Sequence, residues 1–142
     1  MPLVSDIAEA VKNELNSQSF SMPFTAARGY LPSFELPEMK DLHVTVVPNG
    51  ITMAALGRDR AQYDCKVDVA VQKKLEDAGN AEVDALMALV EEIAEHFNRK
   101  RLLGVQEAAW VRTENAPIYS QEHLSELRQF TSVVTLAYRV AK

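Results

Sequence analysis

The sequence predicts an α+β domain, with a mostly antiparallel sheet, two main helices packed on one face of it and a projecting β-arm. Two stretches, YDCKVDVAVQ at residues 63–72 and FTSVVTLAYRV at residues 130–140, alternate between apolar and polar residues. This alternation is typical of strands with one face in the core. Over residues 83–97 apolar residues instead recur every three or four positions, as in an amphipathic helix. Since each strand has one apolar face, helices are needed on one side only, and the other face is expected to be wet.

Size and composition indicate a single globular domain over residues 1–142. Hydrophobic residues make up 47% of the chain and charged residues 25%, close to the averages for soluble proteins. The sequence contains neither an apolar run near the roughly 20 residues that cross a bilayer nor a secretion leader. We therefore expect a protein made and kept in a cytoplasm, without membrane contact. The net charge of -5 argues against a protein whose main task is to grip nucleic-acid phosphates.

The first element is expected to be a helix at about residues 5–17. Its apolar residues follow a 3.6-residue period, and Asp6 and Glu9 have the spacing of a capping box. A short strand is predicted in FTAARGYLP, residues 24–32. A loop with two prolines then leads to the strand LHVTVVP, residues 42–48.

An arm is expected to project between the strand at residues 42–48 and the long strand at about residues 61–73. The Asn-Gly step at 49–50 favours a tight turn. Beyond it, residues 51–55 are interpreted as an extension of the hairpin, and GRDR at residues 57–60 as its polar tip.

Three further elements follow the main helix. Basic residues 99–101 are expected to close that helix, where the dipole favours cations. VQEAAWVRT at 105–113 is predicted to be a strand, and SQEHLSEL a short helix opened by Ser120. The stretch at 130–140 is the last strand. One of its faces is expected to carry Phe130, Ser132, Val134, Leu136, Tyr138 and Val140.

The sequence contains no motif that indicates catalysis, a cofactor or a metal. GxGxxG, GxxxxGK[ST], GxSxG and HExxH are all missing from it. His43, His96 and His123 lack the spacing of metal ligands and are interpreted as surface or capping residues. The single cysteine, Cys65, lies on the apolar face of its strand and is expected to be buried and inert. We expect no enzyme, although a carboxylate pair from distant strands would escape a reading of the sequence.

Four stretches occur in an order that resembles a family of small proteins from tailed bacteriophages and prophages. They are VTVVPNG, YDCKVDVAVQKKL, ALMALVEEIAEHF and PIYSQEHLSELRQFTSVVTLAY. The family is that of the tail terminators, also called tail completion or minor tail proteins. The resemblance spans about residues 40–140 and rests on the order and spacing of the four stretches.

The resemblance implies a structural protein of the virion, without catalytic residues or cofactors. Such proteins form a ring, usually a hexamer, on the head-proximal end of the tail tube after synthesis in the host cytoplasm. The ring stops tube polymerisation, offers a docking surface to a head completion or connector protein, and lets DNA pass through its central hole. The implied partners are further copies of the chain, the tail tube protein and the head connector. Alternatives are another neck component such as a head closure protein, a small enzyme with an unrecognised pocket, and an adaptor.

A closed ring needs two different contact patches on every subunit. The polar face of the long strand is one candidate, because side chains of both charge signs fix the register of a contact. The arm is the other, since its exposed apolar side chains need cover. The polar face carries Asp64, Lys66, Asp68 and Gln72, and the apolar arm carries Met53, Ala55 and Leu56. The expected interface residues are Met53, Leu56, Arg58, Arg60, Asp64, Lys66 and Asp68.

Overall fold

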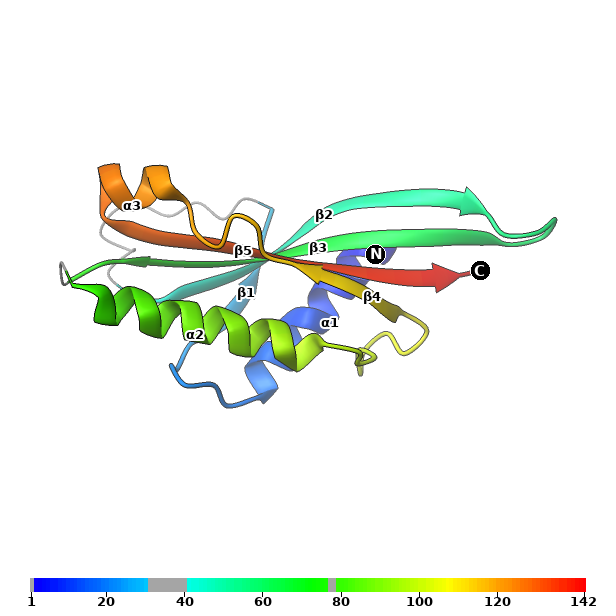
Figure 1. The fold of residues 1–142 in the computed structure, drawn as a ribbon. Helices are drawn as coiled ribbons and strands as arrows, with labels where there is room; N and C mark the ends of the chain where they lie inside the picture. The colour runs from blue at the N-terminus through cyan, green and yellow to red at the C-terminus, as the bar shows by residue number, and fades with distance from the viewer. Residues whose placement is uncertain (1, 31–40, 77–78) are drawn as a thin grey trace.

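The computed structural model describes residues 2–30, 41–76 and 79–142. Within these ranges the chain forms one five-stranded sheet with three helices, so the predicted α+β class is confirmed (Figure 1). The sheet order is β1-β2-β3-β5-β4. The elements are α1 (Leu3–Ser17), β1 (Ala26–Arg28), β2 (His43–Ala55), β3 (Ala61–Lys74), α2 (Asn80–Phe97), β4 (Ala109–Glu114), α3 (Gln121–Leu127) and β5 (Gln129–Ala141).

The sheet is antiparallel except at β1, which pairs with β2 in parallel over three residues. Its centre is the pair β3 and β5, which is in register from Gln62 opposite Ala141 to Lys74 opposite Gln129. Strands that are long, adjacent and fully paired satisfy nearly all their backbone groups within the sheet. The β3–β5 pair is therefore the rigid support from which the other parts of the molecule extend.

Helices α1 and α2 both cover one face of the sheet, as the sequence predicts. Helix α1 packs against β1, β2 and β3, and α2 packs against β5. The face of β5 predicted to be apolar is buried beneath them along its whole length, and Cys65 is buried beside it. Burial raises the pKa of the Cys65 thiol, which keeps it in the unreactive protonated form. Helix α3 contacts β5 from the other side of the sheet (Figure 1).

The prediction of a tight turn at Asn49-Gly50 is wrong. Strand β2 continues through this step to Ala55, and its register with β3 shifts between Pro48 and Gly50. The extra residue, Asn49, forms a β-bulge, and its side-chain amide donates to Asp68 Oδ2 at 2.8 Å. An Asn-Gly step serves a bulge as well as a turn, because both need a locally irregular backbone.

The chain reverses instead at residues 56–60, which confirms the predicted polar tip. Gly57 has a φ of 81°, a conformation that glycine adopts without strain. The Leu56 N–H donates to the Arg60 carbonyl at 2.9 Å and closes the reversal. We call residues 50–66 the arm. In Figure 1 it extends beyond the helices and beyond the end of β4.

Several predicted boundaries differ from the structure. Helix α1 begins at Leu3 after Pro2, without a side-chain cap, so the predicted capping box at Asp6 does not form. Strand β1 is shorter than predicted, and residues 31–40 of the predicted strand and loop lie outside the described residues. Strand β4 begins at Ala109 rather than at residue 105. Helix α3 is confirmed, with the Ser120 side chain accepting a hydrogen bond at its N-terminus.

Two further features bear on function. In the described ranges, no helix has the length and apolar character needed to cross a bilayer. Over the same residues, no three side chains of the His, Cys, Asp or Glu type are grouped so that they could bind a metal ion.

Candidate assembly surfaces

The arm carries an apolar face that the helix layer leaves uncovered. Directly opposite residues of paired strands share a face, so Ile51 lies beside Cys65, and Met53 beside Tyr63. Cys65 is completely buried, whereas Ile51 is 41% exposed and Met53 is 63% exposed. The apolar face of the sheet thus continues past the edge of the helix layer. Contiguous apolar surface of this kind marks a contact site more often than a solvated one.

The arm is an ordered extension of the sheet. The end of β5 runs along β3, with Tyr63 opposite Val140. At its end, Ala61 and Lys142 exchange two backbone hydrogen bonds of 2.8 and 3.0 Å. The Arg60 guanidinium also donates to the Ala141 carbonyl at 3.3 Å. A contact surface that is already ordered loses less conformational entropy on binding.

The polar sheet face is more self-contained than the sequence suggests. Asp64 accepts from Arg139 on β5, with Nε 2.8 Å from Oδ1, and this hydrogen bond lowers the pKa of Asp64. Asp68 accepts from the Thr135 hydroxyl at 2.7 Å and from the Asn49 amide. Lys66 is exposed. The two acids predicted for this patch, Asp64 and Asp68, therefore already bind side chains of the neighbouring strands in the same subunit.

The expectation that Gln72 is wet is wrong, because its exposed fraction is 4%. Gln72 lies opposite Thr131 of β5. The Thr131 hydroxyl is 2.8 Å from Nδ1 of His123 on α3. The second face of the sheet is thus covered at the end where α3 lies, and the polar patch is confined to residues 64–68 of β3, at and within the base of the arm.

The Asp64–Arg139 pair predicts a pH-dependent contribution to stability. Because the folded-state pKa of Asp64 is lowered, the pair stabilises the fold above the ordinary aspartate pKa and loses that effect as the pH falls through the lowered value. In urea unfolding at neutral pH, Asp64→Asn is expected to have a slightly lower midpoint than wild type. The difference should shrink at acidic pH. A difference that is constant with pH would contradict this role.

A groove runs between α2 and the edge strand β4, and no pattern in the sequence predicts it. It consists of two adjoining hollows of about 510 and 500 Å³, which share Glu91, Ala94 and Asn115. Its floor and walls are mainly apolar and come from α2, β4 and the segment after β4. They include Met87, Val90, Trp110 and Ile118. The acids Asp84, Glu91 and Glu95 lie along the α2 side.

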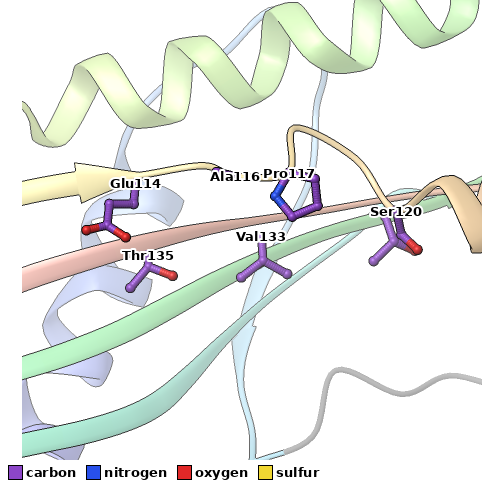
Figure 2. Close-up of a pocket in the computed structure, with 7 residues that line it drawn as sticks. Glu114, Ala116, Pro117, Ser120, Val133 and Thr135 are labelled. Atoms are coloured by element: carbon purple, nitrogen blue, oxygen red, sulfur yellow. The ribbon is translucent and has the colours of Figure 1, made fainter.

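A smaller pocket of about 180 Å³ lies between β5 and the segment from β4 to α3 (Figure 2). Glu114, Pro117, Ser120, Val133 and Thr135 are among the residues that line it. Glu114 also accepts from Arg112 at 2.8 Å. The lining offers one carboxylate, already in an ion pair, beside hydroxyl groups and methyl groups.

A buried polar cluster joins α1, α2 and β5. His96 Nε2 is 3.4 Å from Glu14 Oε1, and the two side chains are only 14% and 10% exposed. The interpretation of His96 as a surface or capping residue is therefore wrong. The hydroxyl of Tyr138 lies buried in the same region, and burial raises its pKa, with the charge of Glu14 acting in the same direction.

One comparison with known proteins, that with solved structures, finds a similar fold. No family model and no curated protein matches the sequence. Among solved structures, the chain is similar to the sheath/tube terminator of an extracellular contractile injection system, PVC, in its extended state. That likeness has a TM-score of 0.52 at 17% identity and covers 100% of this chain and 57% of the terminator. Another solved structure matches at a TM-score of 0.48 and 17% identity, over 96% of this chain and 91% of its own.

The fold is therefore similar to that of the solved sheath/tube terminator. This chain spans little more than half the length of the solved terminator.

Proposed function

We propose that this chain is a tail terminator subunit of a phage or phage-like particle. In this role several copies, expected to be six, form a ring on the head-proximal end of the tail tube. The ring ends tube growth and presents a surface to a head completion or connector protein. The observation that carries the proposal is the likeness of the whole chain to a sheath/tube terminator. The four sequence stretches that resemble phage tail terminators support it independently.

The surfaces of the molecule suit this work. An ordered arm with an uncovered apolar face provides a contact that a lone subunit leaves unused. The net charge of -5 suits a channel through which DNA must slide without being held. We propose that the protein acts by shape and by subunit contacts rather than by catalysis, and that it resides in the virion after assembly in the host cytoplasm.

Negative-stain electron microscopy of the protein mixed with matching tail tubes tests the proposal. We expect a ring at one end of each tube, and shorter tubes when the protein is added during tube polymerisation. Binding to the isolated head connector but not to tube ends would instead favour a head closure protein. Decoration along the tube wall, or no binding to either partner, would reject the terminator role.

A further inference from the structure

We infer that the arm of one copy docks in the groove between α2 and β4 of the next copy. This inference deepens the proposed function, on which it rests, because it assigns the two different patches that every subunit of a ring must carry. The occupant of the groove is thus a second copy of this chain. Its docking surface is the apolar face of the arm.

The two surfaces are both mainly apolar. The arm offers Ile51, Met53 and Leu56, which are among the most exposed large apolar side chains of the described residues. The groove offers apolar side chains in two adjoining hollows of about 510 and 500 Å³. Removing the exposed parts of these three apolar side chains from water favours the contact and opposes the entropy lost on association.

Opposite charges flank both surfaces. The arm tip carries Arg58 and Arg60, with Asp59 between them, and the α2 side of the groove carries Asp84, Glu91 and Glu95. The β4 side of the groove carries Arg112, whose charge is offset by its ion pair with Glu114. Arg60 is held near the base of the tip by its hydrogen bond to the Ala141 carbonyl. Charges at the rim of an apolar contact guide the approach and set the register of docking. The acids of α2 are therefore placed to receive the basic tip of a neighbouring arm.

The topology requires the contact to be intermolecular. The arm is built on β2 and β3, whereas β4 lies at the opposite edge of the sheet, beyond β5 (Figure 1). An arm cannot reach its own groove across the sheet that holds it. A contact between two different patches is heterologous, and its repetition closes into a ring or continues as a helix.

Disulfide cross-linking of purified protein at millimolar concentration tests the contact. In a Cys65→Ala background, Met53→Cys is combined with Ala94→Cys, which places one thiol on the arm and one in the groove. Mild oxidation is expected to give a ladder of covalent oligomers. Met53→Cys alone should give no ladder, because a single thiol per chain joins at most two copies. The matched control replaces Ala94→Cys by Leu103→Cys, at a residue that is 74% exposed and does not line the groove.

The ladder is expected to exceed that of the control at least about tenfold. An equal ladder, or none, would overturn the docking. The cross-linking experiment tests only the docking of arm and groove. The terminator role is tested separately, by whether the protein caps tail tubes. Rings on tube ends without the ladder would reject the docking alone, and a ladder from a protein that caps no tube would reject the terminator role alone.

Charge reversal gives a second, independent readout. Arg58→Glu with Arg60→Glu damages only the arm, and Glu91→Arg with Glu95→Arg damages only the groove. Each double variant is expected to self-associate at least about tenfold more weakly than wild type in sedimentation experiments. Combining all four changes in one chain should restore association, because the charges are then exchanged. Failure of restoration, with all variants folded by circular dichroism, would contradict the assigned pairing of charges.

Discussion

Tyr138→Ala is expected to lower the free energy of unfolding by about 3–5 kcal/mol, the largest effect on stability that we predict. Tyr138 is among the largest completely buried side chains of the described residues. It lies on β5 between Cys65 of β3 and Trp110 of β4 and belongs to the hydrophobic core, so its loss leaves a cavity in that core. Total stabilities of such domains are about 5–15 kcal/mol. Urea unfolding followed by circular dichroism measures the change.

Tyr138→Phe is the matched control, because it keeps the ring and removes only the hydroxyl. That hydroxyl is buried without a hydrogen-bond partner among the described residues. Its removal is expected to change stability by less than about 1 kcal/mol, since no bond is lost. A large loss in Tyr138→Phe would show that the hydroxyl is bonded in solution. A small loss in Tyr138→Ala would show that the core closes around the cavity.

Met53→Asp combined with Leu56→Asp is expected to abolish ring formation while leaving the subunit folded, the largest effect on assembly that we predict. Both side chains are substantially exposed, at 63% and 43%, so the subunit loses little on their replacement. A carboxylate placed in an apolar contact must instead be desolvated without a partner. We expect each subunit contact to weaken at least about 30-fold, equivalent to roughly 2 kcal/mol.

Mass measurement of the assembled species, with and without tube ends as template, records the outcome. The matched control is Leu103→Asp, which adds a carboxylate at an exposed apolar residue away from the arm. It should assemble like wild type. Unchanged assembly in the Met53 and Leu56 variant would exclude the arm from the ring contact, whereas equal loss in the Leu103 control would attribute the effect to added negative charge.

The regular elements could be predicted from the sequence because each has one dominant period. The alternation along β3 and β5 and the helical repeat along α2 extend over more than ten residues each, so local errors average out. The uncovered apolar arm was also predictable, since Met53 and Leu56 lie just before a polar tip. The interface role of the arm remains a prediction.

Features that depend on distant residues could not be predicted. Gln72 has the same local pattern as Asp68, yet it is buried because the second face is covered where α3 packs against β5. His96 lies near the end of α2, but tertiary packing places it against Glu14 of α1. The groove could not be predicted either, because it depends on how distant elements pack together. Its walls come from α2 and β4, and small residues such as Ala94 on the flank of the α2 stripe are the only local sign of it.

The β-bulge at Asn49 reverses the alternation of side chains between the two halves of β2. Before it, even-numbered residues such as Val44 and Val46 point toward the helices, while beyond it the odd-numbered Ile51 and Met53 do so. With a regular backbone, Thr52 and Ala54 would point toward the helices instead. Ile51 and Met53 would then lie on the polar face of the sheet, beside the Asp64–Arg139 pair. Shortening the strand by this residue should keep the orientation, and adding one beside it should invert it. Inserting one residue is thus expected to turn the apolar side chains of the arm away from the helix-covered side of the sheet and to replace them there by Thr52 and Ala54.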